Sequence, residues 1–256
     1  MINFNLIEKA LKKFKNAHPF DHCIVDQFFD LNTAKLLEKD FPEYDDDSWF
    51  EYNNPLEHKK ALNDWNKYPP LTYQILMMLN SPKMIKLLER YIENRLFPDF
   101  GLHGGGWHIH GDGGNLNPHL DYSIHPKCGL QRKINIIIYL SEHINPSIHG
   151  GHLGLWSNDT KKNQPKDLIK EYEPNFNKAI IFDTTQNSWH GISRKLTVPK
   201  NIFRKSLAIY YLCEPINPKK NKRALYAPRN DQLSDKKILN IIKKRVNLEK
   251  SKTVYK

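Results

Sequence analysis

The chain has 256 residues, of which 39% are hydrophobic, 11% aromatic and 26% charged. These proportions are ordinary for a globular protein and exclude a fibrous or disordered chain. No apolar run approaches the roughly 20 residues that a transmembrane helix needs, and three scattered cysteines without a C-x-x-C pair argue against a disulfide framework. We therefore expect one soluble domain with extensions, located in the cytoplasm.

The formal net charge of +11 is concentrated near the C-terminus. The segment "NPKKNKRALYAPRN" and residues 235–256 are rich in lysine and arginine, whereas residues 38–51 are acidic. Clustered cations can bind nucleic acid through its phosphates, but a solvated basic helix is the favoured interpretation. We expect residues 215–256 to form a basic C-terminal extension.

Helical patterns dominate residues 1–100. Apolar side chains recur at helical spacing in residues 3–16, and Pro19 then ends the helix before a first strand in "HPFDHCIVDQFF". "DLNTAKLLEKDFP" predicts a helix that begins after Asp30 or Asn32 and ends before a proline. Residues 68–96 predict two helices separated by Ser81 and a proline, so this part should be a helical and first-strand support region.

The pattern changes at residue 101, where glycine-rich turns begin to separate short β-branched segments. "KINIIIYL", "GHLGLW", "KAIIFD" and "KSLAIYYL" predict antiparallel strands, and their number suits a double-stranded barrel or jelly roll over residues 101–214. The polar stretch 157–177 interrupts the strands and is expected to be a surface loop or a short helical excursion.

A candidate metal site lies in "NPHLDYSIHP". Residues i and i+2 of a strand point to the same face, so His119 and Asp121 would present an imidazole and a carboxylate side by side. A third ligand can come from His190 in "FDTTQNSWHGISR". Two histidines and one carboxylate that leave other positions open suit Fe(II), whereas H-x-D by itself also occurs by chance at a strand edge.

The order of the motifs after this triplet resembles the 2-oxoglutarate, Fe(II)-dependent oxygenases of the prolyl-hydroxylase-like type. His119-x-Asp121 is followed by "RKINIIIYL" (132–140), "GGHLGLW" (150–156), "WHGIS" (189–193) and "FRKSLAIYYL" (203–212). The match spans residues 104–212. The fold that the resemblance implies is mainly β with α, a double-stranded β-helix (jelly-roll) core with packed N-terminal helices.

The resemblance also implies an activity: hydroxylation of a C–H bond, with release of succinate and CO2. Its cofactors would be Fe(II), 2-oxoglutarate and O2, with ascorbate as an additional candidate. The iron ligands would be His119, Asp121 and His190, and Arg204 would bind the distal carboxylate of 2-oxoglutarate. Arg204 is preferred over the other cations that follow the distal histidine because it alone opens an evident strand.

Three further side chains are candidates for binding 2-oxoglutarate. Ser206 lies two residues after Arg204 on the same strand face. Alternation in "RKINIIIYL" places Asn135 and Tyr139 on one face, which should point into the barrel. For Tyr139, a role toward the co-substrate and a purely structural role as a core aromatic are equally supported by the sequence.

A rival metal site is His108-x-His110-x-Asp112, whose side chains would also share a strand face. In the resembling family a glycine-rich segment precedes the H-x-D motif at this place, so Trp107, His108 and His110 are instead candidates for lining the substrate mouth.

Two other classes of function remain compatible with the sequence. One is a non-catalytic barrel that binds nucleic acid or an acidic partner through its basic tail. The other is a cupin-type metal enzyme that acts on a small sugar or metabolite, which would give no role to Arg204. For an oxygenase, the substrate is expected to be a prolyl or other amino-acid residue in a peptide, a free amino acid or a small metabolite.

Overall fold

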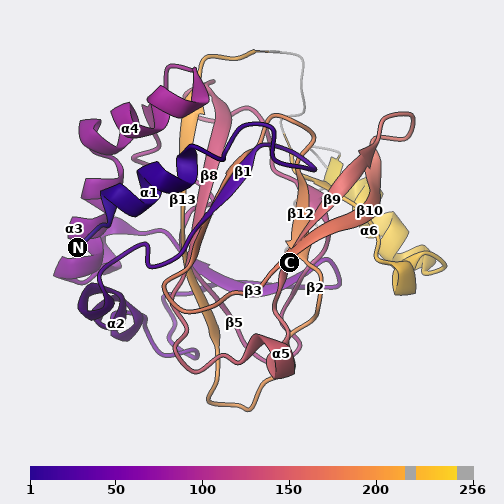
Figure 1. The fold of residues 1–256 in the computed structure, drawn as a ribbon. Coiled ribbons are helices and arrows are strands. Elements are labelled where there is room, and N and C mark those ends of the chain that lie inside the picture. Colours follow the sequence, from indigo (N-terminus) through magenta and orange to yellow (C-terminus); the bar gives the residue numbers. More distant parts are fainter. Residues whose placement is uncertain (217–222, 247–256) are drawn as a thin grey trace.

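The computed structural model describes residues 1–216 and 223–246, which form two antiparallel sheets with helices packed on one side (Figure 1). The strands of the larger sheet are, in spatial order, β1 (His22–Val25), β11 (Ala179–Asp183), β8 (Gln131–Tyr139), β13 (Arg204–Cys213), β5 (Gly106–His110), β3 (Glu57–Leu62) and β2 (Phe50–Asn54). Two short strands extend it, because β4 (Phe97–Pro98) pairs with β13 and β6 (Asn115–Leu116) with β3.

The smaller sheet faces the larger one and contains the strands that carry His119 and His190. Its spatial order is β10 (Gln164–Tyr172), β9 (Leu153–Asp159), β12 (Trp189–Ile192), β7 (His119–Leu120) and β14 (Leu225–Tyr226). Two facing antiparallel sheets with strands alternating between them make the jelly roll that the sequence predicts.

Four helices cover the outer face of the larger sheet: α1 (Phe4–Leu11), α2 (Leu31–Lys39), α3 (Pro70–Leu79) and α4 (Pro82–Ile92) (Figure 1). The remaining helices are α5 (Pro146–His149), α6 (Lys236–Val246) and the 3₁₀ turns η1 (Trp65–Lys67) and η2 (Asn230–Gln232). Within the described residues, every helix is too short or too polar to span a bilayer.

The predicted helix starts are confirmed by their caps. The Asp30 side chain accepts a hydrogen bond from the Thr33 backbone N–H at 2.9 Å, and α2 begins at the next residue after this cap. Ser81 accepts one from Met84 N–H at 3.4 Å and is followed by Pro82 in the first turn of α4.

The two faces of the larger sheet have different chemistry. Ile134, Ile136 and Ile138 of β8 belong to the main apolar core, which lies between this sheet and the helices. The alternate residues face the smaller sheet, where the buried apolar cluster is small and consists of Phe20, Leu153, Leu155, Ile180 and Phe182. The remaining space between the sheets is therefore lined largely by polar side chains, which is the environment of a binding site rather than of a core.

Three strands, β2, β3 and β10, form where the sequence predicts helix or loop. The segment "FEYNNPLEHKKAL" forms the β2–β3 hairpin within the supposedly helical region, and Gln164–Tyr172 forms β10 where a loop or helical excursion was expected. Both expectations were wrong for the same reason. These strands lie at sheet edges or face a polar interior, so they lack the apolar alternation that identifies a strand in sequence.

Candidate metal centre

His119, Asp121 and His190 form a compact cluster between the two sheets. His119 on β7 is the direct cross-strand partner of His190 on β12, and one ligand atom from each of the three residues lies within 4.8 Å of the others. Asp121 Oδ1 is 3.7 Å from His119 Nε2, and Oδ2 is 4.0 Å from His190 Nε2. The strand pairing thus brings two histidines far apart in sequence to one carboxylate.

The proton positions in this cluster fit a metal ion. Nδ1 of His119 lies 3.0 Å from the Asn117 carbonyl, and Nδ1 of His190 lies 2.9 Å from the Ser188 carbonyl. A carbonyl oxygen only accepts, so each Nδ1 carries the proton and each neutral ring keeps its Nε2 lone pair toward Asp121. Asp121 Oδ2 is buried and makes no hydrogen bond with a described residue. Two such lone pairs beside a buried carboxylate suit a cation between them.

The electrostatics favour the same protonation states. Burial opposes the ionisation of Asp121, but the neighbouring His119, His190 and Arg132 hold the pKa of its carboxyl well below its usual range. Burial, reinforced by the adjacent His119, lowers the pKa of His190 to about 4. An ionised carboxylate and a neutral imidazole are the forms that bind metals.

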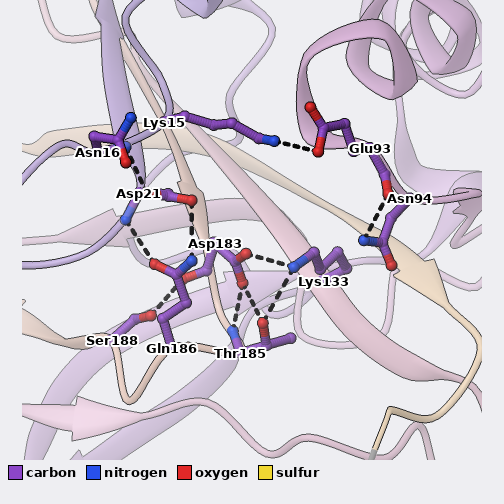
Figure 2. Close-up of polar contacts among 10 residues, drawn as sticks. All are labelled: Lys15, Asn16, Asp21, Glu93, Asn94, Lys133, Asp183, Thr185, Gln186 and Ser188. Atoms are coloured by element: carbon purple, nitrogen blue, oxygen red, sulfur yellow. Dashed lines mark hydrogen bonds and ion pairs between the residues drawn. The ribbon is translucent and has the colours of Figure 1, made fainter.

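The loop between β11 and β12, which positions His190, is tied to two other parts of the sheet (Figure 2). Asp183 at the end of β11 is buried and ion-paired with Lys133 of β8 at 2.5 Å, and the Ser188 hydroxyl donates to the backbone carbonyl of Asp183. Gln186 exchanges two hydrogen bonds with Asp21, at 2.8 and 2.9 Å, just before β1. These contacts fix the backbone whose Ser188 carbonyl orients the third ligand.

His119 is supported from behind by the C-terminal segment. The Tyr226 ring stacks on the His119 imidazole, with centroids 5.2 Å apart and planes 14° apart, and the two residues are cross-strand partners. The Tyr226 hydroxyl donates to Glu57 Oε2 at 3.1 Å, and Arg245 of α6 forms an ion pair with the same carboxylate. A chain of contacts therefore connects α6 to a metal ligand.

Arg229 and Asn117 strengthen this attachment. Arg229 donates to Asn117 Oδ1 at 3.1 Å and to the Ile192 carbonyl at 2.8 Å. The Asn117 amide in turn donates to the Ala227 carbonyl at 3.0 Å and to Gln232 at 2.6 Å. Asn117 is also the residue whose carbonyl orients His119, so this buried network holds the ligand strand.

The C-terminal extension is therefore not simply a solvated basic helix. The lysines of α6 at 236, 237, 243 and 244 are exposed, as expected, but Arg245 is only 8% exposed and is paired with buried Glu57. The sequence could not reveal this pairing, because Glu57 lies 188 residues earlier in the chain. The predicted residues 217–222 and 247–256 of the extension lie outside the described parts.

Arg204 lies at the start of β13 and is 5% exposed. Its Nε donates to the Gly151 carbonyl at 2.9 Å, and its guanidinium lies 4.9 Å from the centre of the Tyr139 ring. Burial lowers the pKa of Arg204, with Tyr139 acting in the opposite direction. With Nε fixed by the glycine carbonyl, the terminal nitrogens form the planar fork that binds a carboxylate bidentately.

The other predicted binding residues gather around Arg204. In strand register, Arg204 faces His110 on β5, and Ser206 lies between His108 on β5 and Tyr139 on β8. The hydroxyl of Tyr139 and both ring nitrogens of His110 are buried and make no hydrogen bond of ordinary geometry with a described residue. Buried polar groups without partners are rare, so this patch fits a polar ligand such as 2-oxoglutarate.

Asn135 lies on the same face of β8 as Tyr139, and its Oδ1 is likewise buried without a hydrogen-bond partner in the described chain. It pairs with Phe182 and Tyr210 in the strand register and lies four residues before Tyr139 along the strand. Asn135 therefore lies beside Phe182 and Tyr210 and not beside Arg204.

The prediction for Trp107 is wrong. Trp107 is fully buried on the opposite face of β5, where its ring stacks on Phe41 and packs edge-on against Tyr68, both at 4.9 Å. Successive strand residues point to opposite faces, so Trp107 belongs to the helix-side core while His108 and His110 face the site. Burial, followed by the nearby cations Lys59 and Arg204, lowers the pKa of both histidines well below its usual value.

The rival triplet of His108, His110 and Asp112 does not come together as a metal-binding group. Asp112 is exposed and accepts a hydrogen bond from Val198 N–H at 3.0 Å. In the described part of the chain, the three residues centred on Asp121 are the metal-binding group that the geometry supports.

Two cations beside the metal centre were not identified from sequence. Arg132 has its guanidinium 3.5 Å from the Tyr210 ring and 3.6 Å from the Tyr122 ring, and Nη1 is 3.7 Å from Asp121 Oδ1. The sequence does contain a signal for Arg132, because it is the first residue of "RKINIIIYL", the strand that follows the H-x-D motif. Lys59 on the unpredicted strand β3 gave no such signal.

Comparison with known proteins agrees with this site. Residues 105–212 match the family model described as the 2OG-Fe(II) oxygenase superfamily. The matched segment begins at β5 and ends in β13, and it includes all three candidate metal ligands and Arg204. No curated protein sequence matches the chain significantly.

Solved structures with similar folds include prolyl hydroxylases and a protein with 2-oxoglutarate bound. A Pseudomonas putida prolyl-4-hydroxylase has a TM-score of 0.57 and 13% identity, over 82% of this chain and all of that one. A Trichoplax adhaerens prolyl hydroxylase, in complex with a hypoxia inducible factor peptide fragment, has a TM-score of 0.56 and 14% identity, over 82% and 89%. HygX from Streptomyces hygroscopicus, with nickel, 2-oxoglutarate and hygromycin B bound, has a TM-score of 0.53 and 11% identity, over 81% and 87%.

The jelly roll thus holds a buried His-Asp-His cluster that could bind one metal ion. Residues 105–212 match the model of the 2OG-Fe(II) oxygenase superfamily, and the chain shares the fold of prolyl hydroxylases. The family match and the His-Asp-His cluster together support Fe(II) as the cofactor and 2-oxoglutarate as the co-substrate.

Proposed function

We propose that this enzyme hydroxylates a C–H bond of an amino-acid residue or a free amino acid. In this proposal His119, Asp121 and His190 hold Fe(II), and Arg204 binds the distal carboxylate of 2-oxoglutarate. The observation that carries the proposal is the cluster itself, in which both Nδ1 atoms are bound to backbone carbonyls and both Nε2 atoms are left for a metal.

Iron and 2-oxoglutarate together supply the oxygen chemistry: one oxygen atom of O2 enters the C–H bond and the other enters succinate as CO2 leaves. The chain positions these reactants and excludes water. Strands β7 and β12 and the residue that follows β7 position His119, His190 and Asp121, which would hold the metal and would leave coordination positions for 2-oxoglutarate and O2. Arg204 and Ser206 fix the far end of the co-substrate, and Tyr139 closes the space beneath it.

The substrate class is supported by the kinds of ligand that similar folds bind. One similar structure holds a peptide fragment and another holds the small molecule hygromycin B. A prolyl or other residue in a peptide, or a free amino acid, fits a site that lies between two sheets.

A turnover assay tests the proposal. Purified protein with Fe(II), ascorbate and 2-oxoglutarate should release succinate, and the rate should rise with an accepted member of a peptide and amino-acid panel. Anaerobic addition of 2-oxoglutarate to the Fe(II) protein should also produce a metal-to-ligand absorption band. Absence of both the band and succinate release would refute the proposal, whereas unaltered co-substrate affinity in an Arg204→Met variant would favour the cupin-type alternative.

Gly151 provides a specific test of the role of Arg204. It has φ +76°, and a Cβ here would lie 3.0 Å from Arg204 Cδ and 2.6 Å from Leu196 Cδ1. We therefore expect Gly151→Ala to displace the guanidinium and to weaken 2-oxoglutarate binding by about tenfold, which corresponds to about 1.4 kcal/mol. Isothermal titration of the metal-loaded protein with 2-oxoglutarate measures this change.

Gly129 gives the matched control. It has a similar φ of +73°, but a Cβ at this position would meet no atom within 4 Å. Gly129→Ala should carry the same backbone strain without any effect on 2-oxoglutarate affinity. Equal losses in the two variants would show that Arg204 does not anchor the co-substrate.

Binding of nucleic acid by the exposed lysines of α6 stays a prediction. It should appear as affinity that falls steeply with salt concentration. Lys236→Glu and Lys243→Glu would weaken it without altering succinate release.

A further inference from the structure

An excess of positive charge lies beside the metal centre. Six buried or nearly buried charged side chains interact with one another in this region: Lys59, Arg132, Arg204, Arg245, Glu57 and Asp121. Four are cations and two are carboxylates, so this group carries a net charge of +2. Burial lowers the pKa of His108 and His110 well below its usual value, which favours their neutral forms. The nearby ion pair of Lys133 and Asp183 is balanced in itself.

Loading the enzyme would not remove this excess. Fe(II) brings two positive charges and 2-oxoglutarate brings two negative ones, so the balance is unchanged. Arg204 would then be matched by the distal carboxylate of the co-substrate, and Arg245 is already matched by Glu57. The excess is left on Lys59 and Arg132. Uncompensated buried charge is unfavourable, so the site is set up for a further anion.

Of these two cations, Arg132 is already engaged. Its guanidinium is held between two tyrosine rings, it donates to the His103 carbonyl, and it lies 3.7 Å from Asp121 Oδ1. These contacts place it behind the metal ligand. It therefore supports Asp121 and has little freedom to reach another molecule.

Lys59 differs in each of these respects. Its ammonium makes no hydrogen bond with a described residue; the nearest carboxylate oxygen of Glu57 is 3.8 Å away, and the Tyr52 ring centre is 5.1 Å away. Its side chain keeps 13% exposure. Burial lowers the pKa of Lys59, while Glu57 and then Asp121 favour its charged form.

His110, whose ring nitrogens have no hydrogen-bond partner in the described chain, lies next to Lys59. The register of β3 with β5 pairs residue 60 with residue 109, which places Lys59 beside His110 on the inner face. His110 is 2% exposed and neither ring nitrogen makes a hydrogen bond of ordinary geometry in the described chain. A neutral imidazole can donate one N–H to an anion. Lys59 and His110 thus present a charge and a donor from adjacent strands.

We propose that the substrate carries a carboxylate, which Lys59 binds through its ammonium while His110 donates a hydrogen bond. This inference rests on the proposed hydroxylase function and specifies its substrate class. The carboxylate can belong to a free amino acid or to an acidic residue in a peptide, since both present the same anion.

Binding measurements on a complex that cannot turn over test this inference. Protein loaded with Ni(II) and saturated with 2-oxoglutarate, so that Arg204 is occupied, is titrated with two matched pairs. The pair L-proline and L-prolinamide reports on a free α-carboxylate. The pair of blocked Gly-Asp-Gly and Gly-Asn-Gly peptides reports on a side-chain carboxylate. In at least one pair the acid should bind about tenfold or more tightly than its amide, because a charge-assisted hydrogen bond is lost in the amide.

Lys59→Met should abolish this preference and leave the affinity of the amide unchanged. Lys60→Met is the matched control, because Lys60 is the next residue on β3, points to the other face and donates to the Tyr44 carbonyl at 2.7 Å. It should keep the preference. Thermal melting checks that both variants are folded.

The outcomes separate this inference from the proposed function. If no acid binds the wild-type complex more tightly than its amide, or if Lys59→Met keeps the preference, the carboxylate assignment is wrong even when 2-oxoglutarate binds normally. If 2-oxoglutarate itself fails to bind the metal-loaded protein, the proposed function fails first.

Discussion

Replacing Asp121 with asparagine is expected to lower the affinity for Fe(II) by more than about 100-fold, or about 2.7 kcal/mol, and to abolish succinate release. Asparagine keeps the shape of the side chain but removes the charge that faces two imidazole nitrogens at 3.7 and 4.0 Å. Competition with a chelator under anaerobic conditions measures metal affinity directly. Because that readout does not depend on turnover, it separates loss of metal from loss of chemistry.

The matched control is Asp112→Asn. Asp112 belongs to the rival triplet with His108 and His110, but it is exposed and bound to Val198 N–H. Metal affinity should therefore stay the same in this variant. If Asp112→Asn instead lowers metal affinity as much as Asp121→Asn does, the assignment of the metal centre to the His119 strand is wrong.

The metal ligands could be identified from sequence because their geometry is local or follows from strand order. His119 and Asp121 share a face by the period of two, and His190 follows a strand of strongly β-branched character. The same period explains the wrong prediction for Trp107. Neighbouring residues of a strand point to opposite faces, so an assignment that is off by one residue places a core side chain in the site. Without a known register, the sequence does not show which of Trp107 and His108 points inward.

The cations around the centre could not be found in the same way. Lys59 lies on a strand whose inner face is polar. Its sequence, "EHKKAL", therefore lacks the alternation of apolar and polar residues by which a strand is recognised. The pairing of Arg245 with Glu57 joins two residues 188 positions apart. Long-range charge pairs leave no local pattern, so a helix rich in lysine and arginine is indistinguishable in sequence from one that is entirely solvated.

Replacing Arg245 with methionine is expected to release the C-terminal segment from the metal-ligand strand. The substitution removes a cation from a carboxylate that is only 2% exposed, and breaking such a buried pair costs about 3 kcal/mol. Because α6 lies near the end of the chain, this loss should appear as local undocking rather than global unfolding. Faster hydrogen exchange in α6 and β14 would show it, and the loss of Tyr226 from behind His119 should weaken metal binding by about tenfold.

Two further variants show whether the charge pair is the cause. Lys244→Met alters the exposed neighbour on the same helix and should leave hydrogen exchange and metal affinity unchanged. Glu57→Gln combined with Arg245→Met removes both buried charges and should restore part of the protection, since a neutral pair has no uncompensated charge to desolvate. If Lys244→Met undocks the segment equally, or if the double variant exchanges faster than Arg245→Met alone, then the packing of α6 and not the ion pair holds this segment against the site.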